Sequence, residues 1–329
     1  MGRSRLFRSL LIGVTGCALA ATLAACGDSD DSAGATVGGG AGDTVEVEHQ
    51  FGTTEIDGVA ERVVTIDVQW TDVMIAMGVE PVGYTVDALM PKGGEPWREG
   101  ERTGEELSLD DGIPVEQIAA LDPDLIVGTY SIADKQTYEQ LAQIAPTIAA
   151  KTKTGVEPWQ KLVATAGELL GDDAQAEQIV SDVEGEIDAV ASELPQVRGK
   201  TYALAQYLVS DSSLVAVADE NDGASRLFKA LGMTMHPALQ QEGEKQGSPR
   251  VTVSPERSDL LASDFLAFLV NGGDESDLAD IPGFDALPAS ESGAVAVLDY
   301  ATIVGINTPT PLSIPYVLDQ MRPYLTKVA

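Results

Sequence analysis

Short apolar runs rich in β-branched residues alternate along most of the chain with segments in which apolar residues recur at helical spacing. Near-continuous apolar strands that alternate with helices are typical of mostly parallel sheets covered by helices on both faces. The pattern therefore predicts an α/β fold. We expect its strands at residues 63–67, 81–84, 125–128 and 147–149 in the first half, and at 201–206, 214–217, 265–270 and 294–298 in the second.

A longer helical pattern lies between the two halves, from Pro158 to Leu194, and Gly171-Asp172-Asp173 interrupts it. Glycine favours a helix C-terminus and aspartate favours the next N-cap, so we expect two helical pieces. The second piece, of about 20 residues, would be about 30 Å long, which is enough to cross from one lobe to another. The chain is thus predicted to form two α/β lobes joined by one long inter-lobe helix. We expect the first lobe, the helix and the second lobe at residues 45–157, 158–195 and 196–329.

The first residues have a pattern of their own, in which three arginines precede an apolar run over residues 10–25. This is typical of a secretory signal and is short for a membrane-spanning helix. The run ends in Leu23-Ala24-Ala25-Cys26-Gly27, which resembles a bacterial lipobox, in which the cysteine is lipidated. We expect a signal peptide at 1–25, a lipid on Cys26, a flexible tether at 26–44, and an extracytoplasmic protein anchored to the cell membrane by the lipid alone. The alternative is a plain secretory signal with an incidental cysteine.

The charge balance excludes one class of partner. The chain has 20 Lys and Arg against 52 Asp and Glu, a net charge of −32, and removal of the signal leaves −35. So acidic a protein has little positive charge with which to bind nucleic acid. Cys17 would leave with the signal and Cys26 would take the lipid. Disulfides, cysteine zinc sites and cysteine nucleophiles are therefore excluded as well.

An internal repeat supports the two-lobe prediction. Glu116 lies eight residues before Asp124, and Glu256 lies eight residues before Asp264. Each aspartate opens a predicted buried strand, and each glutamate falls in the first turn of a predicted helix. The simpler interpretation is that each glutamate only complements the helix N-terminus.

Five segments, spread over nearly the whole body, resemble one family: AERVV at 60–64, MGVEPVG at 77–83, LDPDLIV at 121–127, LAQIAPTI at 141–148 and TPTPLSIPYVL at 308–318. The family is that of the substrate-binding lipoproteins of bacterial ABC importers, in the ferric-siderophore and vitamin B12 class. The resemblance implies the helix-linked class III periplasmic-binding-protein fold, a limited closing motion and a monomer. It also implies that a surface glutamate on each lobe contacts arginines of the ABC importer permease, and Glu116 and Glu256 are the matching positions.

The candidate ligand-binding residues follow from topology, because ligands of open parallel sheets bind beyond the carboxyl ends of the strands. Aromatic residues near such ends are candidates, as are residues of the irregular stretch 87–110 and an arginine at a predicted helix start. For each aromatic residue, packing in the core is the alternative. The candidates are Trp70, Tyr84, Trp97, Arg98, Tyr130, Tyr207, Arg226 and Tyr300.

The ligand class follows from what the protein lacks. Its two histidines, His49 and His236, lie far apart in the sequence, so a zinc site is not expected. A metal would arrive already chelated, with no direct protein ligand and no cofactor, although Asp and Tyr are able to bind iron directly. We expect an iron(III)–siderophore complex, and the acidity favours neutral or cationic hydroxamates over anionic chelates.

Several alternatives stay open at this point. A haem or a corrinoid is one, since a tyrosine can serve as an axial ligand. Free-metal import and a cell-envelope lipoprotein without a small ligand are others. An enzyme is not expected, because the sequence has no Gly-x-Ser-x-Gly, Walker or HExxH motif.

Overall fold

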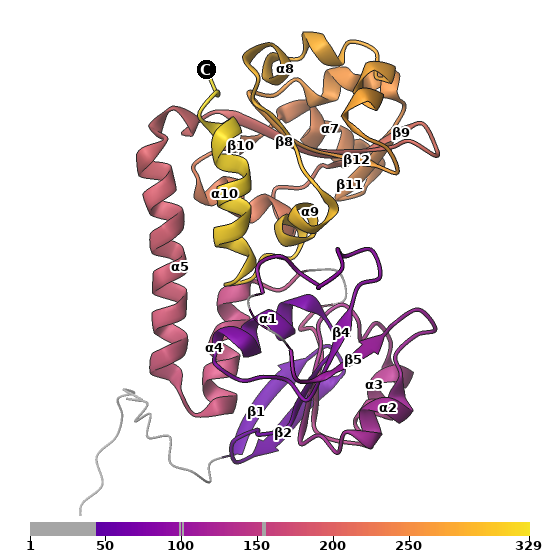
Figure 1. Cartoon of the computed structure of the whole chain (residues 1–329), viewed down its shortest axis with the longest axis vertical. Helices are drawn as coiled ribbons and strands as arrows, with labels where there is room; N and C mark the ends of the chain where they lie inside the picture. Colours follow the sequence, from indigo (N-terminus) through magenta and orange to yellow (C-terminus); the bar gives the residue numbers. More distant parts are fainter. Residues whose placement is uncertain (1–43, 99, 101, 153–155) are drawn as a thin grey trace, which may run out of the picture. The chain divides into compact units, whose positions relative to one another are not determined.

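The first half of the chain forms a parallel sheet with the strand order β5-β4-β3-β6-β7. Figure 1 shows β4 and β5 of this sheet side by side. The computed structural model describes residues 44–98, 100, 102–152 and 156–329, so the predicted signal, Cys26 and nearly all of the tether lie outside the described residues. The central strands are buried throughout, as expected for apolar strands covered on both faces. The strands are β3 (Val63–Thr65), β4 (Gly83–Val86), β5 (Glu105–Ser108), β6 (Leu125–Val127) and β7 (Thr147–Ile148). The helices are α1 (Val68–Ala76), α2 (Val115–Ala120) and α3 (Lys135–Leu141).

Strand β5 is a correction to the prediction of an irregular stretch over 87–110. Its sequence, EELS, has a single buried residue, Leu107, so it carries almost no hydrophobic signal. It forms because its backbone pairs in parallel with β4 at the edge of the sheet. Edge strands need fewer apolar residues than central ones, which explains why the pattern did not predict it.

An antiparallel hairpin of β1 (Thr44–His49) and β2 (Gly52–Asp57) precedes the sheet and was not predicted. His49 holds the hairpin through both ring nitrogens. Its Nδ1 accepts the backbone N–H of Phe51 at 3.2 Å, and its Nε2 lies 2.9 Å from Thr54 Oγ1. The ring is therefore neutral, and burial lowers the pKa of His49.

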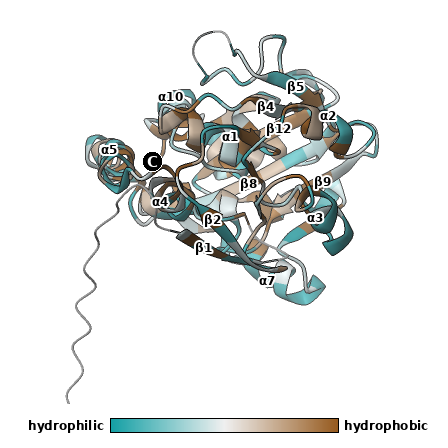
Figure 2. Cartoon of the chain, turned by 90° about the horizontal axis from the view of Figure 1, so that it is seen from below, coloured by the Kyte–Doolittle hydropathy of each residue, from teal (hydrophilic) through white to brown (hydrophobic). Residues whose placement is uncertain are grey.

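The connecting segment has the break that the sequence predicted. Helix α4 (Trp159–Leu170) ends at Gly171, whose φ of 67° is in the left-handed region that favours glycine. Asp172 then caps α5 (Asp173–Glu193) by accepting the backbone N–H of Gln175 at 3.0 Å. Figure 2 colours α5 in both teal and brown, as expected for a helix that buries one face.

The second half forms a mixed sheet with the strand order β11-β9-β8-β12-β13, and β10 pairs with β8. Strands β8, β12 and β13 are parallel, whereas β9 is antiparallel to both of its neighbours. The strands are β8 (Thr201–Leu208), β9 (Ser213–Val217), β10 (Thr234–Met235), β11 (Arg250–Val253), β12 (Phe265–Asn271) and β13 (Val295–Val297). The α-helices are α6 (Arg226–Ala230), α7 (Pro237–Gln246), α8 (Pro288–Ser292), α9 (Tyr300–Asn307) and α10 (Ser313–Leu325). The 3-10 helices are η1 (Pro195–Val197), η2 (Gly223–Ser225), η3 (Pro255–Leu261), η4 (Glu275–Asp280) and η5 (Phe284–Ala286).

All eight predicted strands are thus present, and the prediction of mostly parallel sheets is confirmed. The short strands β10 and β11 were missed. Within the described ranges, no helix combines the length and the apolar character that crossing a membrane requires.

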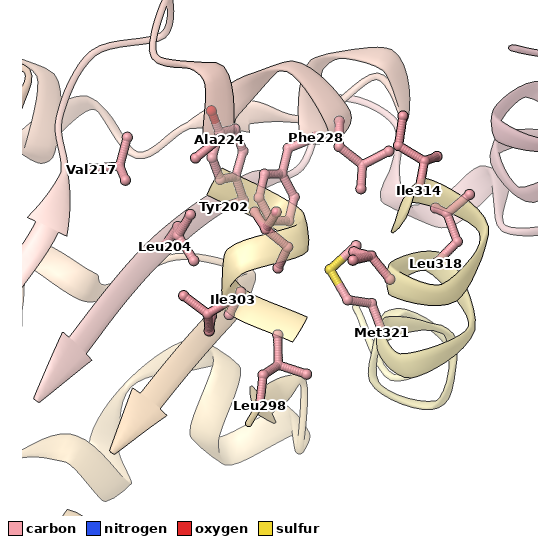
Figure 3. Close-up of a cluster of buried hydrophobic side chains, with 14 of the residues drawn as sticks. Tyr202, Leu204, Val217, Ala224, Phe228, Leu298, Ile303, Ile314, Leu318 and Met321 are labelled. Carbon is pink, nitrogen blue, oxygen red and sulfur yellow. The ribbon is translucent and has the colours of Figure 1, made fainter. Parts of the chain in front are cut away.

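The core of the second lobe lies between its sheet and the last helices of the chain (Figure 3). Tyr202 of β8 stacks on Phe228 of α6 with ring centroids 4.4 Å apart. Helix α10 adds Ile314, Leu318 and Met321 to the same cluster, and all three are buried. Tyr202 therefore has a structural role in this core.

The repeated Glu–Asp spacing corresponds to the same local structure in both lobes. Asp124, just before β6, accepts the backbone N–H groups of Glu61 and Arg62, both at 2.9 Å. Asp264, just before β12, accepts the backbone N–H and the hydroxyl of Thr201, both at 2.7 Å. In each lobe the aspartate fixes the start of its strand against the start of the parallel neighbour. The repeat in the sequence is therefore a repeat in the structure.

Candidate functional site

The strand order of the first sheet reverses between β3 and β6. Strands β4 and β5 are added on one side of β3, and β6 and β7 are added on the other side. Ligands of open parallel sheets bind at such a point. Here Asp67 caps α1 by accepting the N–H of Trp70 at 2.9 Å, and it also accepts the N–H and the hydroxyl of Thr129, the latter at 2.9 Å. Burial raises the pKa of Asp67, although these hydrogen bonds act in the opposite direction. The carboxylate thus joins the carboxyl ends of both central strands.

A cavity of about 480 Å³ opens at this edge of the sheet. Asp67, Asp87 and Asp110 line it from the ends of successive strands, and Tyr130 lines it with half of its surface exposed. Val304 of α9 also lines it, so the second lobe forms part of the wall.

A second cavity, of about 420 Å³, lies at the carboxyl ends of β12 and β13. Asp274, Asp299 and Tyr300 line it. The hydroxyl of Tyr300 donates a hydrogen bond of 2.7 Å to Asp87 of the first cavity. Partial burial and this bond to a carboxylate raise the pKa of Tyr300 to about 12. The strand ends of the two lobes therefore face one cleft, and a neutral tyrosine spans it.

A third cavity, of about 550 Å³, adjoins the first and shares Asp87 and Glu95 with it. Two of the predicted ligand residues, Tyr84 and Arg98, line it together. Tyr84 is buried and its hydroxyl lies 3.4 Å from Glu106, and burial raises the pKa of this phenol. The structure thus brings Tyr84 and Arg98 to the margin of the cleft.

The side chains of Trp97 and Arg98 point toward a buried carboxylate. Asp72 of α1 accepts hydrogen bonds from Trp97 Nε1 at 2.8 Å and from Arg98 Nε at 2.6 Å. Glu95 pairs with the same guanidinium at 2.5 Å. Burial opposes the charge of the guanidinium, but Asp72 and Glu95 together raise the pKa of Arg98. The positive charge of Arg98 is therefore already balanced by carboxylates inside the protein.

Asp72 also connects the two lobes. The hydroxyl of Thr310, between α9 and α10, donates to the same carboxylate at 2.6 Å. Gln69 of α1 donates to the carbonyl of Pro309 at 3.1 Å. The indole of Trp97 packs against Tyr316 of α10 at 5.7 Å between ring centroids. A buried polar and aromatic contact therefore joins α1 to the last part of the chain.

Three other predicted ligand residues lie away from the two cleft cavities. Trp70 and Tyr207 are buried in the hydrophobic core, with 1% and 4% of their surface exposed. Arg226 lies at the start of α6 and lines neither cavity, and burial lowers its pKa while Glu157 and Asp222 act against that effect. The prediction that these three residues contact the ligand is therefore not supported by where they lie. Tyr130 and Tyr300 are the predicted residues that line the two cavities.

The two candidate docking glutamates occupy equivalent positions. Glu116 is exposed in the first turn of α2, which follows the carboxyl end of β5. Glu256 is exposed in the first turn of η3, which follows the carboxyl end of β11. Both therefore lie toward the edge of the sheet at which the cleft opens.

Sequence reasoning missed the acidic residues that line the cleft, Asp87, Asp110, Asp274 and Glu275. Each follows a strand, so its position in the sequence was an available signal, but the prediction relied on aromatic residues. Among the residues that the structure describes, no group of three or more His, Cys, Asp or Glu side chains is arranged to hold a metal ion.

The cleft has counterparts in known proteins. A sequence profile described as periplasmic binding protein matches residues 63–301. The chain belongs to this family. The iron(3+)-hydroxamate-binding protein FhuD of Bacillus subtilis is 26% identical over 313 residues, which cover 94% of this chain and 95% of that protein. The probable siderophore-binding lipoprotein YfiY of the same species is 26% identical over 197 residues, and this match spans 58% of either protein.

The three-dimensional comparison agrees with the sequence comparison. PiaA of Streptococcus pneumoniae, whose structure was solved in complex with ferrichrome, matches with a TM-score of 0.70 and 27% identity. The match covers 86% of this chain and 99% of PiaA. The family resemblance and the α/β class that the sequence predicted are therefore confirmed.

Proposed function

We propose that this protein is an extracytoplasmic solute-binding lipoprotein that captures a ferric siderophore in the cleft and delivers it to an ABC importer. The observation that carries the proposal is the pair of cavities at the carboxyl ends of both sheets, spanned by the bond from Tyr300 to Asp87. Family membership supports the same reading. Within the described residues no group of three or more His, Cys, Asp or Glu side chains is arranged to hold a metal ion, and we infer that iron enters inside an organic shell.

The hydroxamate class of siderophore is favoured by two relatives. FhuD is named for iron(3+)-hydroxamate binding, and PiaA was solved with ferrichrome. In the cleft, the ring of Tyr130 offers an apolar wall for the organic shell of such a chelate. The neutral phenol of Tyr300 offers a hydrogen bond once it leaves Asp87.

Ligand titration tests the proposal directly. The purified protein would be titrated, with tryptophan fluorescence and calorimetry as readouts, against ferric hydroxamate, ferric catecholate, ferric citrate, haem and cobalamin. Saturable binding of a ferric hydroxamate is the expected result. A Soret band after titration with haem, without binding of any ferric siderophore, would replace the proposal with haem capture. No saturable binding of any compound would favour a cell-envelope lipoprotein without a transport role.

Docking to the permease forms the second part of the proposal. Glu116 and Glu256 are exposed at equivalent positions of the two lobes, so one symmetric pair of permease sites could bind both. Charge reversal to Arg at either position should reduce uptake of the ferric siderophore by cells and leave its affinity for the purified protein unchanged. Glu177→Arg, on the exposed face of α5, is the matched control and should leave uptake intact. Loss of ligand affinity in Glu116→Arg or Glu256→Arg would contradict the docking role.

The lipid anchor is tested separately, since Cys26 lies outside the described residues. Cys26→Ser should move the protein from the membrane fraction to the soluble extracytoplasmic fraction. Retention of the variant at the membrane would show that another segment anchors it.

A further inference from the structure

The lining of the cleft has one sign of charge. Four carboxylates line the first cavity, and they are Asp67, Asp87, Glu95 and Asp110. Three line the second cavity, and they are Asp274, Glu275 and Asp299. Within the described part of the chain, no lysine, arginine or histidine lines either cavity. A ligand held between them would therefore meet a negative potential from both lobes.

Two of these seven carboxylates are buried, and the other five are exposed. Asp67 and Glu95 are buried, and burial raises the pKa of both, so they contribute least to the field in the cleft. Asp110 and Glu275 are exposed at the rim, and their side chains make no hydrogen bond within the described residues. Asp274 is held in the charged form, because hydrogen bonds from Ser276 lower its pKa. Asp274 thus keeps its negative charge at neutral pH.

The nearest positive side chains do not offset this field. Arg98 and Arg102 line the adjoining cavity, not the two that face each other across the cleft. Arg98 is paired with Asp72 and Glu95, and Arg102 is paired with Glu80 at 3.2 Å. An anionic chelate would therefore find no unpaired cation among these groups. It would also give up water of hydration to lie beside carboxylates, which repel it.

We propose that the cleft selects, among iron(III) hydroxamate complexes, those with a net positive charge, such as a linear trihydroxamate that keeps a free protonated amine. The inference rests on the proposed function and specifies its substrate class. The hydroxamate oxygens would coordinate the iron, and the ammonium group would lie in the negative potential of the exposed carboxylates, of which Asp110 lines the first cavity and Glu275 the second. Neutral complexes would bind less tightly, and anionic complexes least.

A matched series of ligands separates charge from shape. One linear iron(III) trihydroxamate with a terminal amine would be compared with its N-acetyl and N-succinyl derivatives, which carry the same iron coordination and net charges of about +1, 0 and −1 at neutral pH. Two rim carboxylates at roughly 7 Å from the added charge predict a change of about tenfold in the dissociation constant from the cationic to the neutral complex at low salt. The preference should shrink in concentrated salt, because exposed charges are screened.

A double variant tests whether the rim is the cause. Asp110→Asn with Glu275→Gln removes two negative charges from groups without side-chain partners, so the fold should be unaffected. The variant should bind the cationic complex about tenfold more weakly and the neutral complex with unchanged affinity. The control, Glu177→Gln with Asp188→Asn on the exposed face of α5, removes the same charge away from the cleft and should change neither affinity.

The outcomes distinguish this inference from the function on which it rests. Equal affinity for the three complexes, or tightest binding of the succinylated one, would overturn the charge selectivity and leave siderophore capture standing. An unchanged preference in the double variant would also overturn it. Binding of none of the three complexes, together with binding of haem or cobalamin, would overturn the proposed function itself.

Discussion

Asp72 lies at the centre of the buried contact between the two lobes, and we expect Asp72→Ala to lower the free energy of unfolding strongly. Its carboxylate has no exposed surface and accepts hydrogen bonds from three directions. The donors are Trp97 Nε1 at 2.8 Å, Arg98 Nε at 2.6 Å and Thr310 Oγ1 at 2.6 Å. The first two belong to the first lobe, and Thr310 follows α9 of the second lobe.

The size of the effect follows from what alanine leaves behind. Removal of one partner from a buried ion pair costs about 3–5 kcal/mol, because the other charge stays buried. Glu95 still pairs with Arg98, which favours the lower end of that range. The unsatisfied indole N–H and hydroxyl add about 1–3 kcal/mol. We therefore expect a loss of about 4–6 kcal/mol, a large share of the roughly 5–15 kcal/mol that stabilises a typical protein.

Equilibrium urea unfolding of Asp72→Ala, Thr310→Val and the double variant would measure this loss. The sum of the losses in the two single variants should exceed the loss in the double variant, because Thr310 has no carboxylate to bind once Asp72 is gone. Asp188→Ala on exposed α5 is the control and should change stability by less than about 0.5 kcal/mol. A loss below about 1 kcal/mol for Asp72→Ala, or strict additivity with Thr310→Val, would refute the reasoning.

Three further predictions concern single sites. Gly104→Ala should lower the free energy of unfolding by about 1–3 kcal/mol, because its Cβ would lie 2.2 Å from the carbonyl oxygen of Pro81. Gly185→Ala, with open space around it inside α5, should instead raise that free energy by about 0.5–1 kcal/mol. His49→Gln should reduce the loss of stability on acidification. Burial lowers the pKa of His49 in the folded protein, so the unfolded chain binds the proton first, and stability falls as the pH drops below the ordinary value of 6.5.

Urea unfolding measures the free energy of unfolding of each variant. The histidine variant is measured at both pH 7.5 and pH 5.5, roughly the interval over which an imidazole titrates. Equal stabilities of Gly104→Ala and the wild type would show that the loop moves aside without cost. An identical pH dependence in His49→Gln and the wild type would show that other groups cause the acid sensitivity.

Local patterns were enough to predict most of the framework. The apolar runs at 63–67 and 125–128 could be identified as central strands, because strands buried on both faces need apolar residues at every position. The end of α4 was also predictable, because a left-handed terminal residue strongly favours glycine and Gly171 occupies it. Strand β5 was not predicted, because it forms by pairing with the edge of β4, and the residues of β5 carry no signal of that pairing.

The candidate site depended more on the tertiary structure. The sequence placed aromatic residues near strand ends, and for Tyr130 and Tyr300 this was enough to find residues that line the cleft. It could not show that Trp97 and Arg98 bind Asp72, because that contact is set by the path of the loop after β4.

The class of fold, the family and the excess of negative charge were predictable from the amino-acid sequence, because these depend on composition, periodicity and the order of motifs. The positions of those charges in space depend on the tertiary structure. Hydrogen bonds such as Thr310 to Asp72, 238 residues apart, depend on how the chain returns on itself. The same folding pairs Arg98 with carboxylates inside the protein and leaves Asp110 and Glu275 exposed in the lining of the cleft. Long-range packing therefore decides which side chains stay exposed at the strand ends, where we propose that the ligand binds.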